Sequence, residues 1–260
     1  MNKVVENKEL DTRMVYYMVD TTRPRPVIVI CPGGGYAWRS PREAKPVAKA
    51  FNEAGYHAVV LEYAVENPPL DERPLRDLSW AVATLRAEAD NMQIHPEQIV
   101  VCGFSAGGHL AGSLGVFWND EERFPEHSVR ERHRPNAMIL NYPVISSGEF
   151  AHRGSFERLS SDRAEQDRYS LEKFVTEDVP PCFIWHTVTD PSVPVKNTLL
   201  FVEQLIEKKV PVELMLFPTG SHGLSLATQE VSDVENNRHP DPHIARWFDQ
   251  CVDWLATLWK

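Results

Sequence analysis

Two short segments of this chain are apolar at nearly every position. Pro26–Cys31 contains the run VIVI, and Ile99–Gly103 contains the run IVVC. A strand that is apolar on both faces is covered on both sides, which is typical of the centre of a parallel sheet. Other runs rich in Val, Ile, Tyr and Phe that end at Pro, Gly or Asp predict five further strands. They are Met14–Val19, Ala58–Tyr63, Ala137–Tyr142, Cys182–His186 and Val212–Phe217.

Segments with helical patterns separate most of these strands. Alternation of strands and helices implies an α/β fold, with a mostly parallel, doubly wound sheet, helices on both faces and right-handed crossovers. The predicted helices are Pro41–Ala54, Pro74–Ala89, Ser105–Phe117, Val195–Lys208 and Ile244–Leu258.

Two segments do not fit this alternation. Asn119–Pro135 is charged and rich in turn residues, and Ser146–Pro181 carries a short amphipathic piece near Leu171–Val175. Both are interpreted as surface loops or as a partial lid, with the lid favoured for residues 146–181. Open α/β proteins bind ligands at the carboxyl edge of the sheet, where such a lid would lie.

The composition excludes several classes of protein. The 260 residues are 42% apolar and 25% charged, as in a soluble globular protein rather than a disordered, fibrous or membrane protein. The 27 basic and 37 acidic residues give a net charge of −10, which argues against nucleic acid and anionic membranes as partners. The N-terminus has no apolar core typical of a signal peptide, and no run reaches the length of a membrane span, so the cytoplasm is the expected location.

The four cysteines have no C-x-x-C spacing, and three of them lie in apolar runs. This pattern argues against a zinc site or a redox pair. We therefore expect reduced thiols in the core.

The pentapeptide Gly103-Phe104-Ser105-Ala106-Gly107 has the pattern G-x-S-x-G between a predicted strand and a predicted helix. A turn this sharp requires small residues around the serine, since a Cβ there would clash with neighbouring backbone. The turn raises the hydroxyl above the sheet, beside the free N–H groups of a helix N-terminus. A phosphate-binding loop is the alternative, but the segment has neither a lysine nor the G-x-G-x-x-G spacing. Ser105 is the predicted nucleophile.

A serine hydroxyl requires a base, and the base requires an orienting partner. On a sheet with this type of turn, the chain order is serine, acid, histidine. Asp190 follows the strand Cys182–His186, and His222 follows the strand Val212–Phe217. Both lie past carboxyl ends of strands, at the edge where Ser105 is expected, and are the predicted acid and base.

Other acidic and histidine residues fit these roles less well. Asp178 precedes its strand and belongs at the opposite edge of the sheet. His239 and His243 lie at the approach to the last helix, which they would cap or solvate. His186 ends a strand and is expected to order the acid loop, and His109 is expected to pack or to hydrogen-bond a loop.

Three consecutive glycines lie in Pro32–Tyr36, directly after a central strand. Glycine adopts positive φ angles without strain and leaves the backbone N–H groups accessible. Such a loop can direct amides at the oxyanion of a tetrahedral intermediate, together with the N–H of Ala106. Gly34 and Gly35 are the predicted donors, with Gly33 left open and a flexible turn as the alternative.

These motifs together resemble the α/β-hydrolase superfamily, and within it the esterases around acetyl-xylan esterases and hormone-sensitive-lipase-like carboxylesterases. The resemblance covers nearly the whole chain in the correct order. It implies the α/β-hydrolase fold, the catalytic set Ser105, His222 and Asp190, and no cofactor or metal. The matching segments are PGGGY at Pro32–Tyr36, GFSAGGHLA at Gly103–Ala111, DPSVP at Asp190–Pro194 and GSHG at Gly220–Gly223.

The chain departs from the pattern at Phe104, where many relatives have a polar residue, and at Thr187, where glycine often follows the strand histidine. Both departures can reshape the pocket. Phe104 and the two aromatic residues after the oxyanion loop, Tyr36 and Trp38, are candidate substrate-binding residues, with burial in the core as the alternative.

The expected activity is hydrolysis of a short-chain acyl ester, such as an acetyl group on a sugar, through an acyl-enzyme. A small ester is therefore the expected partner. One alternative is a peptidase of the prolyl-oligopeptidase type, although those usually carry a propeller domain before the hydrolase. Another is an inactive relative used for binding.

The site elements must converge on one sheet edge, so residues 1–260 are interpreted as one domain, with 146–181 as an insertion. The last helix carries Trp247, Trp254 and Trp259. These side chains are expected to pack on the sheet, and a homodimer through this helix is the alternative.

Overall fold

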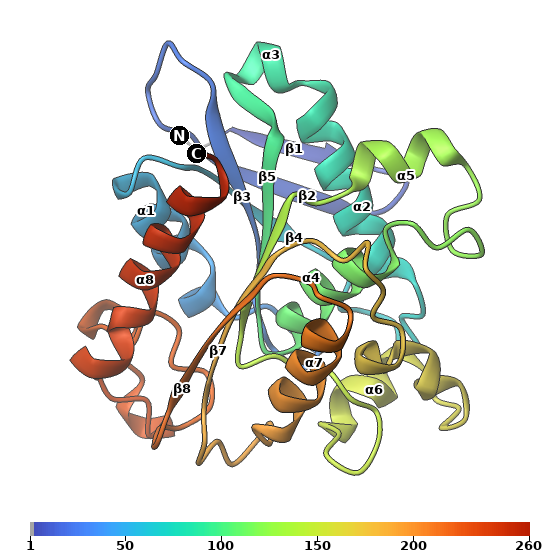
Figure 1. Cartoon of the computed structure of the whole chain (residues 1–260), viewed down its shortest axis with the longest axis vertical. Coiled ribbons are helices and arrows are strands. Elements are labelled where there is room, and N and C mark those ends of the chain that lie inside the picture. The colour runs from blue at the N-terminus through green and yellow to red at the C-terminus, as the bar shows by residue number, and fades with distance from the viewer. Residues whose placement is uncertain (1–2) are drawn as a thin grey trace.

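The computed structural model describes residues 3–260 and contains one eight-stranded sheet (Figure 1). The spatial order is β1-β2-β4-β3-β5-β6-β7-β8. Neighbours from β4 to β8 are parallel, whereas β2 is antiparallel to both β1 and β4. The predicted parallel α/β sheet is thereby confirmed. The strands are β1 (Val4–Asn7), β2 (Thr12–Tyr17), β3 (Arg25–Cys31), β4 (His57–Glu62), β5 (Ile94–Phe104), β6 (Ala137–Asn141), β7 (Cys182–Thr187) and β8 (Val212–Phe217).

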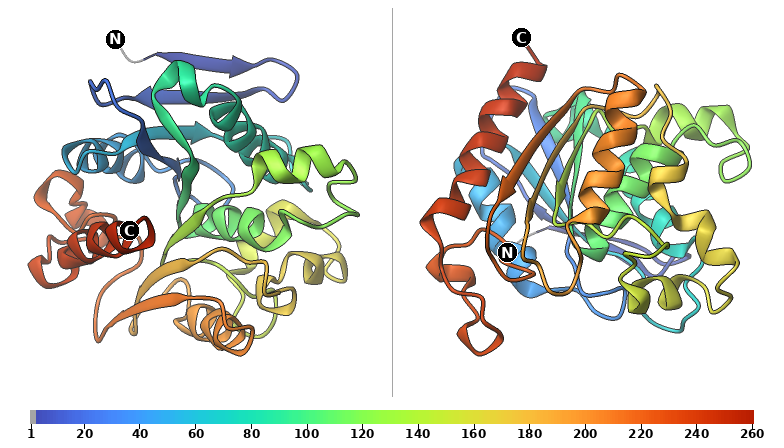
Figure 2. Two further views of the ribbon diagram at one scale, coloured as in Figure 1. Left: turned by 45° about the horizontal axis from the view of Figure 1, so that its top comes forward. Right: turned by 60° about the horizontal axis from the view of Figure 1, so that its bottom comes forward.

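Helices cover both faces of this sheet (Figures 1 and 2). On one face lie α1 (Lys45–Glu53) and α8 (Pro242–Leu258), and on the other lie α2 (Arg73–Ala87), α4 (Ala106–Phe117) and α7 (Lys196–Glu207). The apolar run in β3 explains this arrangement, because Val27 and Val29 pack into one core cluster while Ile28 and Ile30 pack into the other. All four side chains are fully buried.

The predicted strands match the observed ones within a few residues, except that β5 begins at Ile94 rather than at Ile99 and that β1 was not predicted. Its sequence VVEN is short and has no buried position, so it carries little apolar signal. The predicted helix Pro41–Ala54 is divided into a 3-10 turn, η1 (Pro41–Glu43), and α1. The division lies at Ala44, whose φ of −104° and ψ of −102° are not helical.

The predicted loop Asn119–Pro135 contains a short helix, α5 (His127–His133), packed against α2. This helix was not predicted, because the charged composition of the segment is typical of a surface loop. Arg130 is buried in it and donates to the carbonyl of Phe124 at 2.8 Å, so its charge does not mark a solvent-exposed loop.

The segment 146–181 contains a short helix, α6 (Arg153–Leu159), and two 3-10 turns, η2 (Glu165–Tyr169) and η3 (Leu171–Lys173). Backbone hydrogen bonds join α6 to the loop after β4. The N–H of Leu70 donates to the Arg158 carbonyl at 2.8 Å, and the N–H of Asp71 donates to the Leu159 carbonyl at 2.9 Å. The segment therefore forms an anchored wall at the carboxyl edge of the sheet.

The remaining short elements are α3 (Ala89–Met92), η4 (Gln229–Val231) and η5 (Val234–Asn236). Among the described residues, no helix is both long and apolar enough to cross a membrane.

The last helix packs on the sheet. Trp247 and Trp254 are buried in the core cluster beneath α8, and Trp259 packs against its edge. The sheet therefore occupies the apolar face that a homodimer through this helix would have used.

All four cysteines are buried and unpaired, as predicted.

Candidate active site

Ser105 occupies a strained turn between β5 and α4. Its φ of 54° and ψ of −118° lie outside the usual regions for a residue with a side chain. A Cβ added at Gly103 would lie 2.0 Å from the carbonyl oxygen of Gly107, and one at Gly107 would lie 2.0 Å from that of Cys31. The G-x-S-x-G pattern therefore reflects the close packing of α4 on β5 and β3.

Ser105, His222 and Asp190 form a continuous chain of hydrogen bonds. The Ser105 Oγ lies 2.8 Å from the His222 Nε2, and the His222 Nδ1 lies 2.6 Å from the Asp190 Oδ2. A carboxylate can only accept, so His222 donates through Nδ1 and accepts the serine proton at Nε2. The turn after β5 and the loops after β7 and β8 thus bring these side chains to one edge of the sheet.

Asp190 is held as a carboxylate by its surroundings. Burial acts to raise the pKa of Asp190, but hydrogen bonds from His186 and His222 outweigh burial and hold the pKa well below its usual value. The second oxygen, Oδ1, accepts the backbone N–H groups of Ser192 and Val193 at 2.8 and 2.9 Å.

His186 orders the acid loop, as the sequence predicts. Its Nε2 lies 3.0 Å from the carbonyl oxygen of Val193 and 3.3 Å from the Asp190 Oδ2. Since both partners accept, Nε2 carries the proton, and Nδ1 accepts from the Thr198 hydroxyl at 2.7 Å.

The glycine loop after β3 presents backbone amides beside Ser105. Gly34 and Gly35 have φ angles of +133° and +63°, and their N–H groups donate to no acceptor among the described residues. The Gly33 N–H instead donates to the Glu43 Oε2 at 2.8 Å, which removes Gly33 from the possible donors. Ala106 is the first residue of α4, where an amide has no acceptor within the helix.

Sequence reasoning missed the role of Glu43 and Tyr142. Besides binding Gly33, the buried Glu43 carboxylate accepts the Tyr142 hydroxyl at 2.7 Å, and that hydroxyl accepts the Ser225 N–H at 2.9 Å. The Tyr142 ring also meets the His222 imidazole edge-on, with 5.0 Å between ring centroids. These two side chains therefore connect the glycine loop to the loop that carries His222. A glutamate in a predicted helix gave no sign of this connection.

A cavity of about 560 Å³ opens above Ser105 and His222. Trp38 lines this cavity and is 51% exposed, so it can contact a ligand. Two lining arginines also fix the base loop, since Arg42 donates to the Gly223 carbonyl at 2.7 Å and Arg238 donates to the His222 carbonyl at 3.0 Å.

Two of the predicted substrate-binding aromatics are core residues. Tyr36 is 1% exposed, and its hydroxyl donates to the His109 Nδ1 at 2.8 Å. Phe104 is 0% exposed and packs against the rings of Tyr142 and Trp247. Both predictions were wrong, because adjacency to a site residue does not specify the direction in which the next side chain points.

The insertion contributes His152 to the cavity wall, a residue that sequence reasoning also missed. Its Nδ1 lies 2.8 Å from the Ser155 hydroxyl. Burial and the nearby His222 lower the pKa of His152, so its imidazole is neutral at pH 7. In the sequence, only its place within the predicted insertion 146–181 pointed to a role for His152 at the site.

The competing candidates lie outside this cavity. Asp178 receives a hydrogen bond from Asn119, and His239 and His243 are exposed. His109 is buried, and its Nε2 donates to the carbonyl of Tyr169 at 2.7 Å. Thr187 is buried, and its hydroxyl donates to the Gly220 carbonyl at 3.1 Å.

Comparison with protein families identifies the chain. The model of the BD-FAE family matches residues 14–205. The chain belongs to the BD-FAE family. This result confirms the resemblance to esterases of the α/β-hydrolase superfamily.

Solved structures resemble this BD-FAE family member along nearly their whole length. An acetyl ester-xyloside bifunctional hydrolase from Caldicellulosiruptor lactoaceticus is 36% identical, with a TM-score of 0.84 over 95% of this chain and 88% of that one. The carboxylesterase Cest-2923 from Lactobacillus plantarum is 26% identical, with a TM-score of 0.85 over 99% of this chain and 96% of that one.

Curated relatives of the BD-FAE chain are longer. Endo-1,4-beta-xylanase B from Butyrivibrio fibrisolvens is 38% identical over 82% of this chain and 35% of its own length. Acetylxylan esterase from Xylanibacter ruminicola is 26% identical over 83% of this chain and 44% of its own length. The chain therefore spans less than half the length of these two relatives.

Proposed function

We propose that this chain is a serine carboxylesterase that hydrolyses short-chain acyl esters, with acetyl groups on sugars as the substrate class. The observation that carries the proposal is the hydrogen-bonded chain Ser105–His222–Asp190 beneath an open cavity. Relatives named as esterases and carboxylesterases support the same reaction.

In the acylation step, the Ser105 Oγ attacks the ester carbonyl while the His222 Nε2 takes its proton. Asp190 fixes the imidazole with Nδ1 as donor and stabilises its positively charged form. The tetrahedral oxyanion is placed toward the amides of Gly34, Gly35 and Ala106, whose N–H groups are free to receive it. Each donor to such an oxyanion is typically worth about 10²–10³ in kcat.

The intermediate collapses when the His222 imidazolium gives its proton to the leaving alcohol oxygen and the C–O bond breaks. Water then attacks the acyl-enzyme, with the same imidazole as base, and releases the acid and the free serine. Protonation of the leaving oxygen lets a poor leaving group, such as a sugar alkoxide, depart as a neutral hydroxyl.

The cavity lining combines charged side chains with an exposed aromatic ring, a combination that suits a sugar alcohol. Arg42, Arg158, Arg238 and Glu157 all contribute to its wall. Each arginine already donates to a backbone carbonyl, whereas the exposed Glu157 carboxylate can accept from a sugar hydroxyl. The exposed indole of Trp38 offers an apolar face to a sugar ring. Relatives named for acetylxylan and for an acetyl ester-xyloside support acetylated xylan as the source of the ester.

A comparison of the wild-type chain with Ser105→Ala tests this proposal. We expect wild type to hydrolyse p-nitrophenyl acetate and the variant to lose at least about 10³-fold in kcat, since the covalent step requires the hydroxyl. A fluorophosphonate probe is expected to label wild type and not the variant. Undiminished turnover by Ser105→Ala would overturn the proposal, as would cleavage of proline amides without ester turnover.

A further inference from the structure

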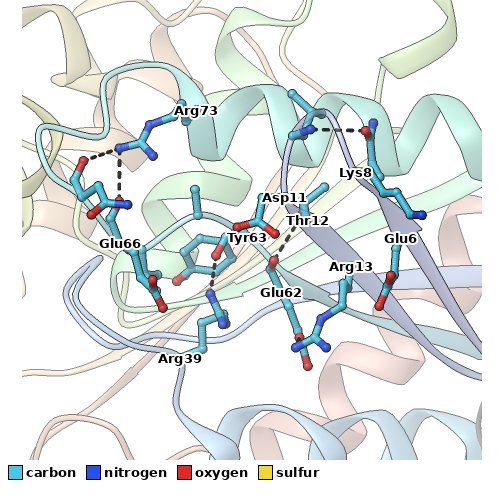
Figure 3. A pocket seen from close by; sticks show the side chains of 15 residues that line it. Glu6, Lys8, Asp11, Thr12, Arg13, Arg39, Glu62, Tyr63, Glu66 and Arg73 are labelled. Atoms are coloured by element: carbon cyan, nitrogen blue, oxygen red, sulfur yellow. Dashed lines mark hydrogen bonds and ion pairs between the residues drawn. The ribbon is translucent and has the colours of Figure 1, made fainter.

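A second cavity, of about 320 Å³, lies between the β1–β2 turn and the carboxyl end of β4 (Figure 3). Residues of the hairpin form one side of it, and the loop after β4, with Arg39 and Arg73, forms the other. Its volume is within the range of small-molecule sites. The catalytic mechanism uses none of the residues that line it.

The two cavities share walls along two separate segments of the chain. Trp38 lines the cavity above Ser105, and the next residue, Arg39, lines the second cavity. The loop after β4 repeats this pattern, since Asn67 lines the second cavity and Pro68 the first. The segments Trp38-Arg39 and Asn67-Pro68 therefore form two ridges between the cavities, and a ligand crossing either ridge would contact both.

The charges in the second cavity indicate the class of ligand. Its lining includes four acidic and four basic side chains, so it attracts neither an anion nor a cation by net charge. The arginines are bound to the protein: Arg13 pairs with Glu62, Arg39 donates to the Tyr63 carbonyl, and Arg73 donates to backbone carbonyls (Figure 3).

Three carboxylates remain available to a ligand. Glu6, Asp11 and Glu66 are exposed, and none of their side chains makes a hydrogen bond or an ion pair within the described residues. Carboxylate oxygens only accept, so their natural partners in a neutral ligand are hydroxyl groups, and hydrogen bonds of this type are stronger than those between neutral groups.

We propose that the second cavity is a subsite for sugar units of an acetylated oligosaccharide whose ester lies above Ser105. Its polar, charge-balanced lining and free carboxylates suit a neutral chain of hydroxyl groups, and the shared ridges make it a neighbour of the reaction site. The exposed indole of Trp38 lies on one ridge, where the chain would cross. This inference rests on the proposed esterase function and extends it to a preference for oligomers.

Steady-state kinetics on acetylated xylose and acetylated xylotetraose test the inference. We expect wild type to show a higher kcat/KM for the tetramer, through a lower KM. The double variant Asp11→Gly, Glu66→Ala should lose roughly tenfold or more of that advantage, which is the scale of lost hydrogen bonds to charged groups. Glycine suits position 11, where φ is 53°. Turnover of p-nitrophenyl acetate and of acetylated xylose should be unchanged.

The matched control is Glu203→Ala, Glu207→Ala, which removes two exposed carboxylates from α7 and should leave the tetramer preference intact. An equal kcat/KM of wild type for the two sugars, or an undiminished preference in the Asp11, Glu66 variant, would overturn the subsite. Failure of the esterase proposal gives a different result, since wild type would then either not hydrolyse p-nitrophenyl acetate or hydrolyse it no faster than Ser105→Ala.

Discussion

At the scale of single residues, Glu43 connects two loops of the candidate site. One oxygen of its carboxylate accepts the Gly33 N–H, and the other accepts the Tyr142 hydroxyl. The first bond orients the loop that carries Gly34, and the second reaches the ring packed beside His222. A carboxylate has two acceptor oxygens, whereas an amide has one. Glu43 is thus a positioning residue that its nearest substitute cannot replace.

Glu43→Gln should therefore lower kcat. The amide leaves either Gly33 or Tyr142 without its acceptor, and a buried unsatisfied donor costs about 1–3 kcal/mol. We expect roughly a tenfold fall in kcat for p-nitrophenyl acetate, with a smaller change in KM, since the amides proposed to bind the oxyanion would be less well ordered. Steady-state kinetics and a melting curve provide the measurement.

Glu53→Gln, at an exposed position in the last turn of α1, is the matched control and should behave as wild type. If Glu43→Gln melts at a lower temperature but keeps full kcat, the role of Glu43 is confined to stability.

Some residues of the candidate site could be predicted from the sequence, and others could not. The chain order and the strand ends predicted that Ser105, Asp190 and His222 would lie together, and they do, because parallel strands place their carboxyl ends at one edge. Tyr36 and Phe104 failed, because the direction of a side chain depends on local dihedral angles. Glu43 was missed for another reason: its partners Gly33 and Tyr142 come from distant parts of the chain.

At the scale of elements, the contact between α4 and β3 limits what the turn at Ser105 can contain. Gly107→Ala would place a methyl group 2.0 Å from the carbonyl oxygen of Cys31 and 2.5 Å from that of Pro32. Both obstacles are backbone atoms that cannot rotate away, so α4 would have to shift. We expect a fall in the free energy of unfolding of about 3 kcal/mol or more, or loss of soluble protein.

Gly154→Ala is the matched control, because its new methyl group meets nothing closer than 3.8 Å. Its position in α6 is helical, and alanine stabilises a helix relative to glycine. Urea denaturation of both variants is the measurement, and equal stability of the two would contradict the steric argument.

A buried carboxyl on α2 connects that helix to the loop after β4. Asp77 accepts the Ala64 N–H at 2.7 Å, and burial raises the pKa of Asp77 from 3.8 to about 7 despite this bond and the nearby arginines. The folded state thus prefers the protonated form. The contribution of Asp77 to stability is full below pH 3.8 and is lost as the pH rises to about 7.

Asp77→Asn should remove this dependence while keeping an acceptor for Ala64. Relative to wild type, we expect the variant to gain free energy of unfolding as the pH rises from 3.8 to about 7. Urea denaturation across this range measures the difference between the two proteins. A constant difference would show that Asp77 has the same pKa in the folded and unfolded chains.

Elements were predictable where their apolar pattern was long. β3 and β5 were found because side chains on both of their faces enter a core, and α8 because its apolar residues recur at helical spacing. The strand β1 and the helix α5 were missed because each is stabilised by its neighbours. β1 pairs with β2, and α5 is held in part by the buried Arg130, contacts that local composition does not record.

At the scale of the whole molecule, two cores on opposite faces of one sheet enclose every thiol. Cys31 and Cys182 lie in one core cluster, and Cys102 and Cys251 lie in the other. Burial raises the pKa of all four thiols, which leaves almost no reactive thiolate at neutral pH.

The native protein should therefore not react with an aromatic disulfide reagent such as 5,5′-dithiobis(2-nitrobenzoate). In denaturant, all four thiols should react. The absorbance of the released aromatic thiolate gives the number of reactive cysteines in the native and in the denatured protein. Rapid release from the native protein would contradict the enclosure of the cysteines by the two cores.

The exposure of the Trp38 indole allows ligand binding to be followed by fluorescence. It is 51% exposed, whereas Trp185 and Trp247 are fully buried and the other tryptophans are buried or partly buried. Its emission is therefore the part of the intrinsic fluorescence most sensitive to water. A sugar chain lying across the ridge at Trp38 would exclude water from the indole and shift this emission to the blue. In the Ser105→Ala variant, binding of the sugar chain could then be followed by Trp38 emission without hydrolysis of the ligand.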